Sequence, residues 1–355
     1  MKLVQIVTQM EYGGAQRVAY LLHQEMEKRG HDSELCFLYV KRSVYQNESG
    51  VSYLCDHQPN ALDYLRIVKR LYTWIRRCQP DAIVAHTHYA NILALFVGWL
   101  ADLQTRVAVQ HNPVQTYPGI SRPVDWLFGS LGIYTKQVAV SDAVIDSMER
   151  YPQSYRQTVE RVYNGVTFAE EAADLLSRTA DLSPSGPKIL HVGRFSKQKN
   201  HDALLDVLAK LPHASLILVG DGESKNDIQR RVQDMELQNR VTFLGEIGPK
   251  EVRAAMRSCD LFMFPSLYEA MPMALLEAMA AGMPIVASDI PANRELLQNT
   301  GVLRKLDPQE FASAAMNLFA DRRYASELGK QAAERASQFT VAAMADSYER
   351  ILLAS

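Results

Sequence analysis

Short apolar runs rich in β-branched residues alternate with longer amphipathic segments along the whole chain. In the first half, one amphipathic segment stops at Gly30, a residue type that readily takes the left-handed conformation at a helix end, and another stops before Pro80. The predicted strands are Leu3–Thr8, Asp32–Val40, Ala82–His86, Arg106–Gln110 and Gln137–Val140, and the predicted helices are Ala15–Arg29 and Ala61–Arg77. Repeated alternation of this kind predicts a parallel sheet with helices on both faces.

The same alternation starts again after residues 167–187, a polar segment with two prolines and a glycine that indicates a connection between domains. The second-half strands are Lys188–Val192, Ser215–Val219, Val241–Leu244, Leu261–Phe264 and Pro284–Ala287. The helices are His201–Lys210, Ser224–Met235, Pro249–Ser258, Met273–Ala281 and Pro308–Phe319, followed by terminal helices within Ala325–Ala354. Two α/β domains are predicted, residues 1–166 and 188–335, with a ligand site outside the carboxyl ends of their strands.

Composition supports two globular domains and removes several functional classes. The chain has 355 residues, 47% of them hydrophobic and 22% charged, which suits two domains of about 150–200 residues each. The net charge of −2 gives no support for a nucleic-acid partner. Four scattered cysteines without paired metal-ligand spacing indicate reduced thiols, as in a cytoplasmic protein.

No membrane span is predicted, and any membrane contact is expected to be peripheral, at the membrane surface. The first residues lack the apolar core of a signal peptide, and the longest apolar stretch, Ile92–Ala101, is far shorter than the ~20 residues of a membrane span. The helix Ala61–Arg77 interleaves basic residues with Leu, Tyr and Trp, a pattern that favours contact with an anionic membrane surface. The alternative is an ordinary surface helix whose apolar stripe faces the sheet.

Two glycine-containing turns follow predicted strands. Gly13 and Gly14 open the first helix, where the backbone can approach a ligand closely and a helix N-terminus attracts negative charge. A plain strand-to-helix turn explains the same pattern equally well. The second turn, Val219–Glu223, has a Gly-x-Gly sequence that is common in α/β proteins, and we interpret it as mainly architectural.

A basic turn follows the strand Lys188–Val192. After Gly193, Arg194 offers a fork of donors for phosphate oxygens and Lys199 offers a compact charge. Asn200 is placed to cap the helix that comes next. The alternative is a solvated basic turn, which two cations beside a glycine at the carboxyl end of a strand disfavour.

The segment Pro265–Pro284 carries two glutamates. We predict a helix from Pro272, a residue type favoured at the first helical position, to just before Gly282. Glu269 lies in the loop before this helix and Glu277 lies on its apolar body. Burying a carboxylate without a hydrogen-bond partner is costly, so a buried Glu277 needs a partner, which a hydroxyl-rich ligand could provide. The alternative is that Glu277 lies on a solvated edge of the helix. Backbone N–H groups at the helix start could stabilise a diphosphate.

Taken in order, these motifs resemble glycosyltransferase family 4. The resemblance covers nearly the whole chain and depends on the glutamate pair separated by seven residues, the Gly-Arg-Phe turn with its Lys-Asn, Val219–Glu223 and the amino-terminal Gly-Gly loop. Supporting segments are Gln110–Asn112, Val140–Asp142 and Val162–Val166. The resemblance implies the α/β GT-B fold: two Rossmann-like, doubly wound domains facing across a cleft, an acceptor domain and a nucleotide-sugar domain. It also implies that a C-terminal helix, residues 336–355, packs back on the first domain.

Individual roles come from the resemblance alone. Arg194 and Lys199 are similar to the pair that binds the donor diphosphate. Glu269 and His111 are similar to the catalytic residues beside the donor sugar, and Glu277 resembles the residue that holds the ribose hydroxyls. The other implied donor-binding positions are Gly13, Gly14, Asn164, Gly193, Leu244, Met271, Pro272 and Met273. Without the resemblance, His111 would be interpreted as a core histidine bound to backbone.

Two segments depart from the family pattern. Ala270 and Met271 stand where glycine commonly follows the first glutamate, and Ser288–Glu295 has Pro-Ala where glycines are usual. Both departures bear on which sugar is recognised more than on the fold.

The implied activity is retaining transfer of a hexosyl or N-acetylhexosaminyl group. The donor is a nucleotide diphosphate sugar, with UDP preferred, and the acceptor is a glycan, a lipid-linked compound or a small molecule in polysaccharide or glycoconjugate biosynthesis. No metal or other cofactor is expected, because fixed cations and helix dipoles can stabilise the leaving diphosphate and no Asp-x-Asp motif marks a strand end. The alternatives are a nucleotide-sugar epimerase of the same fold and a catalytically silent partner subunit. We expect a cytoplasmic protein, with any membrane contact at the inner face.

Overall fold

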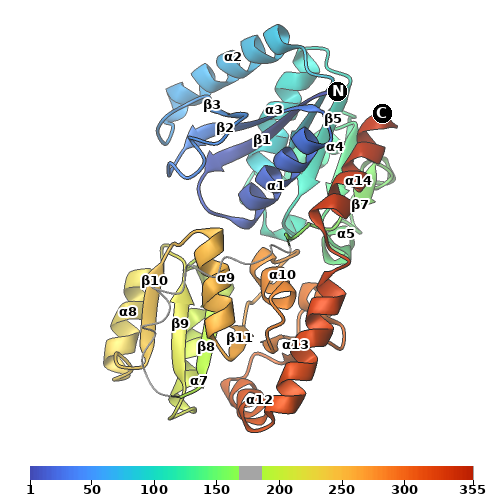
Figure 1. Ribbon diagram of the computed structural model, residues 1–355. Coiled ribbons are helices and arrows are strands. Elements are labelled where there is room, and N and C mark those ends of the chain that lie inside the picture. Colours follow the sequence, from blue (N-terminus) through green and yellow to red (C-terminus); the bar gives the residue numbers. More distant parts are fainter. Residues whose placement is uncertain (168–185, 355) are drawn as a thin grey trace. The chain divides into compact units, whose positions relative to one another are not determined.

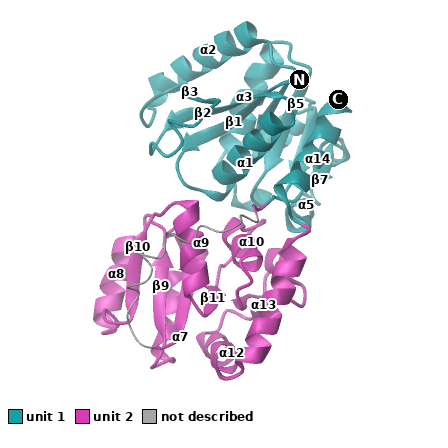
Figure 2. Ribbon diagram, viewed as in Figure 1, with its two compact units in different colours: residues 1–165, 339–355 teal, residues 166–338 magenta. Residues whose placement is uncertain are grey.

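The computed structural model describes residues 1–167 and 186–354 and separates the chain into two compact units (Figure 2). Unit 1 contains Met1–Gly165 together with Phe339–Ser355, and unit 2 contains Val166–Gln338. Most of the predicted interdomain connection, at residues 168–185, lies outside the described residues.

Unit 1 contains a sheet of seven parallel strands in the order β3-β2-β1-β4-β5-β6-β7 (Figure 1). The strands are β1 Lys2–Met10, β2 Asp32–Val40, β3 Val51–Tyr53, β4 Ala82–Ala85, β5 Thr105–Gln110, β6 Lys136–Ala139 and β7 Val159–Arg161. The central strands are buried on both faces, because helices cover the two sides of a parallel sheet. The short strands β3 and β7 at the edges were not predicted.

The helices of unit 1 lie between its parallel strands along the chain, except the last, α14, which follows unit 2. They are α1 Gly14–Lys28, α2 Ala61–Cys78, α3 His88–Leu100, α4 Ser121–Ser130, α5 Asp142–Ser147, α6 Gln153–Arg156 and, from the end of the chain, α14 Val341–Leu353, with a 3-10 turn at Val114–Thr116. Helix α1 ends as predicted, with Gly30 at φ +82°. Helix α3 was missed, because its apolar sequence lacks the polar face that marks an amphipathic helix.

Helix α2 begins and packs by local sequence signals. The Asn60 side chain accepts hydrogen bonds from the N–H groups of Leu62 and Asp63, and the Asp63 carboxylate accepts one from the Asn60 N–H. This reciprocal capping box satisfies N–H groups that no helical carbonyl can reach. Buried side chains at four-residue spacing, Ile67, Leu71 and Ile75, attach the helix to its sheet.

Unit 2 contains six parallel strands in the order β10-β9-β8-β11-β12-β13. The strands are β8 Lys188–Val192, β9 Ser215–Val219, β10 Val241–Gly245, β11 Leu261–Phe264, β12 Ile285–Ser288 and β13 Val302–Arg304. The helices are α7 His201–Ala209, α8 Lys225–Asp234, α9 Pro249–Ser258, α10 Met273–Ala280, α11 Pro291–Leu297, α12 Pro308–Ala320 and α13 Arg322–Ala336, with a 3-10 turn at Lys197–Lys199. Strand β13 and helix α11 were not predicted.

Helix α10 starts at Met273, as in the predicted range Met273–Ala281, but Pro272 is not its first helical residue. Pro272 has an extended backbone (φ −73°, ψ 114°) and is the N-cap, so Met273 is the first helical residue. The C-cap is Ala281, and Gly282 follows with φ +69°, a conformation that favours glycine.

The last helix, α14, lies in unit 1 beside α1 (Figure 1). Arg29, at the end of α1, donates hydrogen bonds to Asp346 and Glu349 at 2.6 Å each. Gly165 allows close approach of the backbone to the start of α14, because a Cβ there would lie 2.5 Å from the Val341 Cα. Tyr348 is buried within the same unit. Among the described residues, no helix combines the length and hydropathy needed to cross a membrane.

Candidate active site

Three loops of unit 2 meet at the carboxyl edge of its sheet. One follows β8 and carries Gly193–Asn200, one follows β9 and carries Gly220–Glu223, and one follows β11 and carries Pro265–Met271. Strand β8 lies between β9 and β11, and all three run parallel. The sheet therefore collects the basic turn, the Gly-x-Gly turn and Glu269 at one edge, which is where open α/β sheets bind ligands.

A nearly water-free ion pair joins Lys199, predicted to bind the donor diphosphate, to Glu269, predicted to be catalytic. The Lys199 Nζ lies 2.5 Å from the Glu269 Oε1, and the two side chains are only 14% and 7% exposed. The same ammonium lies 4.8 Å from the centre of the Phe264 ring, whose face attracts a cation. Lys199 and Glu269 were assigned to different parts of the donor, and the structure shows that they also hold each other.

Backbone hydrogen bonds attach the Glu269 loop to the basic turn. The Leu267 N–H donates to the Gln198 carbonyl at 2.8 Å, and the Gln198 amide donates to the Tyr268 carbonyl at 2.9 Å. Asn200 takes the left-handed conformation, and its amide donates to the Pro265 carbonyl at 3.3 Å. The predicted capping role of Asn200 is therefore wrong: its side chain makes no cap hydrogen bond to α7 and ties the two loops together.

Arg194 is solvent-exposed. Its Nε lies 3.3 Å from the Glu223 Oε2, and the side chains are 53% and 61% exposed. An exposed ion pair contributes little to stability, so Arg194 can exchange this partner for a phosphate at low cost.

The Gly-x-Gly turn is needed for packing between loops. Gly220 has φ +132°, and a Cβ on it would lie 2.1 Å from the Gly193 carbonyl oxygen. Gly222 has φ +159°, and its Cβ would lie 2.4 Å from the Phe195 carbonyl oxygen. Both glycines therefore hold the turn against the basic loop, in agreement with an architectural interpretation.

The start of α10 offers backbone donors. No side chain caps this helix, and the first helical backbone bond is from the Leu276 N–H to the Pro272 carbonyl. The N–H groups of the first helical turn therefore have no acceptor within the helix, an arrangement that suits an anion. Met271 and Met273 are buried, so they would meet a ligand through backbone. Glu277 is half-buried on α10, and Leu244 is half-buried at the end of β10.

Sequence reasoning missed a buried histidine beneath the basic turn. His191 at the end of β8 has its Nδ1 2.9 Å from the Met263 carbonyl, and its Nε2 would lie 3.0 Å from a Cβ at Gly193. Burial and the neighbouring His201 and Lys199 hold the pKa of His191 well below its usual range. A neutral His191 ring places no second positive charge beside Lys199.

In unit 1, four candidate residues follow strands of the other sheet. Gly13 and Gly14 follow β1, His111 follows β5, and Asn164 follows β7. Gly13 is the N-cap of α1 with an extended backbone, and no side chain caps the helix. Asn164 is buried. Because these strands are parallel, the four residues share the carboxyl edge of the unit 1 sheet.

A second missed residue, His86, contacts His111. His86 follows β4, between β1 and β5, and its Nδ1 lies 3.5 Å from the His111 Nε2. In one orientation of the Gln5 side chain, its amide nitrogen donates to the His86 Nε2 at 3.0 Å and to the Ala19 carbonyl at 3.1 Å. In the same orientation the Gln5 amide oxygen accepts a hydrogen bond from the His23 N–H at 2.9 Å. In this arrangement His86 donates to the His111 Nε2 and leaves the His111 Nδ1–H as a donor.

Both rings are uncharged. Burial lowers the pKa of His111 to about 3 and holds the pKa of His86 well below its usual range. A neutral His111 can donate a hydrogen bond near a centre of positive charge without repelling it. Tyr348 of α14 also contacts His86, with ring centres 6.3 Å apart.

One group of residues in the described part of the chain has metal-ligand geometry. The ligand atoms of Cys55, Asp56 and His57 lie within 4.8 Å of one another. The His57 ring already contacts Asp56 at 2.7 Å and Asp63 at 3.2 Å, and these contacts raise the pKa of His57. Ion pairs of His57 with the Asp56 and Asp63 carboxylates therefore explain why these side chains lie close together.

Comparison with known proteins identifies the family. The family model described as "Glycosyltransferase Family 4" matches residues 12–170, and that described as "Glycosyl transferases group 1" matches residues 174–335. The chain belongs to glycosyltransferase family 4.

Two relatives of this family 4 glycosyltransferase match almost end to end. The lipopolysaccharide core biosynthesis glycosyltransferase LpsE of Rhizobium meliloti is 24% identical, with 96% of each chain covered. The N-acetyl-alpha-D-glucosaminyl L-malate synthase of Bacillus anthracis is 26% identical, with 96% of this chain and 93% of the relative covered. Among solved structures, Anabaena HepE in complex with UDP-glucose has a TM-score of 0.88 at 21% identity, with both chains fully covered. The fold is GT-B, as predicted.

Proposed function

We propose that this enzyme is a retaining glycosyltransferase that uses a nucleotide diphosphate sugar, with UDP as the nucleotide. The observation that carries the proposal is the Lys199–Glu269 ion pair, buried beside the exposed Arg194 and the uncapped start of α10. An ammonium, a guanidinium and the N–H groups of a helix start thus lie at one sheet edge, where they could bind a diphosphate. The Glu269 carboxylate at the same edge could contact the sugar.

The reaction separates charge. The bond between the anomeric carbon and the diphosphate oxygen breaks, and its electron pair stays on the diphosphate. Arg194, Lys199 and the N–H groups of α10 stabilise that negative charge in place of a metal. Glu269 and neutral His111 orient the sugar. The acceptor oxygen bonds to the anomeric carbon from the same face, and its proton passes to a diphosphate oxygen, so the anomeric configuration is kept. Glu277 holds the ribose hydroxyls.

The choice of donor and acceptor draws on the similar proteins. The structure of HepE was determined with UDP and with UDP-glucose, which supports a UDP-hexose. The names of the two full-length relatives point to different acceptors, one in lipopolysaccharide core biosynthesis and one a malate. We therefore propose an acceptor in glycoconjugate biosynthesis, reached in the cytoplasm or at the inner face of the membrane.

A thermal-shift screen with UDP-, GDP- and ADP-sugars tests the donor. A ligand that binds the folded state raises the apparent Tm, so the UDP-sugars should give the largest rise. Arg194→Ala should weaken UDP binding by about tenfold or more, because it removes a charge-assisted hydrogen bond from an exposed side chain without disturbing the core. Arg323→Ala on α13, also exposed, is the matched control and should leave the shift unchanged.

Product analysis separates the alternatives. NMR of the product should show a new glycosidic bond with the anomeric configuration of the donor. Release of a free epimerised sugar without any acceptor would instead establish the epimerase. Absence of binding to every nucleotide diphosphate would establish a silent partner subunit and overturn the proposal.

A further inference from the structure

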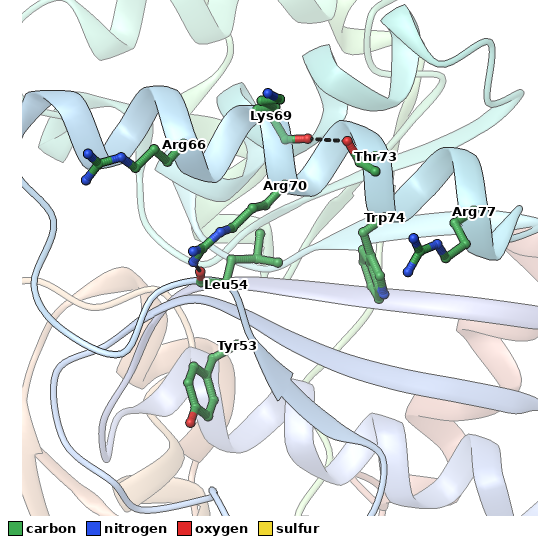
Figure 3. Close-up of a pocket in the computed structure, with 8 residues that line it drawn as sticks. All are labelled: Tyr53, Leu54, Arg66, Lys69, Arg70, Thr73, Trp74 and Arg77. Atoms are coloured by element: carbon green, nitrogen blue, oxygen red, sulfur yellow. Dashed lines mark hydrogen bonds between the residues drawn. The ribbon is translucent and has the colours of Figure 1, made fainter.

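Unit 1 contains a groove whose lining includes none of the candidate residues described above. It has a volume of about 540 Å³ and runs between α2 and the end of β3 (Figure 3). The residues that line it are Tyr53, Leu54, Arg66, Lys69, Arg70, Thr73, Trp74 and Arg77. Four of these eight side chains are cationic and none is acidic, so the α2 groove has a strong preference for negative charge.

Helical spacing produces this concentration of cations. Arg66, Arg70 and Trp74 follow one another at four-residue steps, next to the buried row of α2. Residues four apart lie one above another on the same helix face, so the three side chains form a continuous row. Figure 3 shows Arg70 and Trp74 projecting from α2 toward Leu54.

Only part of the positive charge is neutralised within the protein. Arg66 pairs with Asp63 at 2.8 Å, and Arg70 donates to the Leu54 carbonyl at 2.5 Å. Across residues 1–167 and 186–354, no acidic side chain forms an ion pair with Lys69 or Arg77. The groove therefore keeps unpaired cations at its rim.

Apolar side chains beside the groove are exposed to solvent. On α2, Leu62 is 64% exposed, Leu65 is 69% exposed and Tyr72 is 40% exposed, while Tyr53 on β3 is 44% exposed. A helix that exposes leucines among lysines and arginines is typical of surfaces that lie in a membrane interface. Free phosphate, nucleic acid or an acidic peptide would explain the cations but not the exposed leucines.

We propose that the α2 groove binds the phosphate headgroups of anionic phospholipids, with Leu62 and Leu65 entering the interface beside them. The sequence pattern predicts only that this helix favours a membrane surface, whereas the groove specifies a headgroup site at Lys69, Arg70 and Arg77. The site is independent of the proposed glycosyl transfer, because none of its residues belongs to the donor loops. Attachment would hold the enzyme at a surface where lipid-linked acceptors are concentrated.

The first test is sedimentation of the full chain with vesicles. The wild type should bind vesicles of phosphatidylcholine with phosphatidylglycerol, should not bind phosphatidylcholine alone, and should dissociate as salt is raised. Lys69→Glu/Arg77→Glu should weaken binding by at least about tenfold, since each Lys or Arg near an anionic surface contributes roughly fivefold in affinity. The control Arg323→Glu/Lys330→Glu makes the same charge change at exposed positions of α13 and should bind like the wild type.

The second test reports on the groove without disturbing it. The chain has three tryptophans, and Trp99 and Trp126 are 48% and 41% exposed, so Trp99→Phe/Trp126→Phe leaves Trp74 as the only one. Its emission should shift to shorter wavelength with anionic vesicles and stay unchanged with neutral ones. Leu62→Ser/Leu65→Ser should reduce both binding and this shift.

Several outcomes would overturn the proposal. They are equal binding to both vesicle types, no binding to either, or a charge-reversed groove that binds like the wild type. Displacement by inorganic phosphate beyond that caused by chloride of matched ionic strength would make the groove a free-phosphate site. Stronger binding to polyglutamate or to RNA than to the vesicles would assign it to a macromolecular partner. UDP-induced stabilisation of the same variants is measured separately, so a failure here leaves the donor site unaffected.

Discussion

Lys199 and Glu269 form a buried ion pair within the proposed donor site. Each is charged and almost wholly removed from water, and each satisfies the other at 2.5 Å. Removing one partner from such a pair leaves an isolated buried charge, which costs about 3–5 kcal/mol, whereas removing both can be nearly neutral. A truncation of Lys199 alone is therefore expected to lower stability, whatever its effect on the proposed donor binding.

The pair supports a prediction about stability. Lys199→Met should lower the free energy of unfolding by about 3–5 kcal/mol, because Glu269 is left buried without a counter-charge. Lys199→Met/Glu269→Gln should recover most of that loss and still fail to bind UDP tightly. Urea unfolding of the two single variants and the double variant gives the coupling free energy. A double variant as unstable as the sum of the single variants would show that the two side chains do not interact.

The positions of candidate site residues could be predicted where sequence motifs mark them, whereas their roles stay predictions. Arg194, Lys199 and Glu269 stand in recognisable turns after strands, and the structure places all three at one sheet edge. His86 had no such signal, because its contact with His111 depends on the order β1-β4-β5 in the sheet, which the sequence does not state. Asn200 stands at the N-cap position of α7, but its backbone is left-handed instead of extended and its side chain makes no cap hydrogen bond.

At the scale of elements, prediction succeeded where polar and apolar positions alternate with a clear period. The amphipathic helices α1 and α2 were predicted to within a residue or two, including the end of α1 near Gly30. Helix α3 was missed because burial on most sides removes the polar stripe that the pattern needs. The edge strands β3 and β7 have three residues each, too few for a period of two to be seen.

A close backbone contact at Gly165 contributes to the attachment of α14 to unit 1, besides its ion pairs with α1. Gly165→Ala would place a Cβ 2.5 Å from the Val341 Cα and 2.7 Å from the Thr340 carbonyl oxygen, and backbone atoms cannot yield as a side chain can. We expect a loss of about 1–3 kcal/mol in unfolding free energy, the usual cost of overpacking, together with faster amide exchange in α14. Gly248→Ala is the control, since its Cβ would meet only Glu251 Oε2 at 3.5 Å. Unchanged exchange in α14 would contradict the assignment.

For the whole molecule, buried uncharged histidines make stability depend on pH. Burial lowers the pKa of His111 to about 3 and that of His88 and His201 to about 4, and it holds the pKa values of His86 and His191 well below their usual range. An unfolded chain takes up protons at these residues below about pH 6.5, while the folded chain does not. Folding free energy from each histidine is therefore present above pH 6.5 and lost as pH falls toward the folded-state pKa.

Asp125 acts in the opposite direction. It is fully buried in unit 1, where it accepts a hydrogen bond from the Tyr155 hydroxyl at 2.8 Å, yet burial raises its pKa to about 6. Between about pH 4 and pH 6 the folded chain holds a proton on this carboxyl that the unfolded chain has released. Its contribution therefore makes the protein less stable as pH rises through that interval.

The balance between these groups gives a prediction for both units. Five histidines outweigh one carboxyl, so unfolding free energy should fall from pH 6.5 to pH 4.5, by up to about 1.4 kcal/mol per pH unit for each histidine. His86, His88 and His111 act in unit 1, and His191 and His201 act in unit 2, so both units should be affected. Asp125→Asn removes the opposing contribution and should make the fall steeper between pH 6 and pH 4. Urea titrations at fixed ionic strength measure the unfolding free energy at each pH. A free energy that did not change with pH would mean that these rings take up protons in the folded protein as readily as in the unfolded chain.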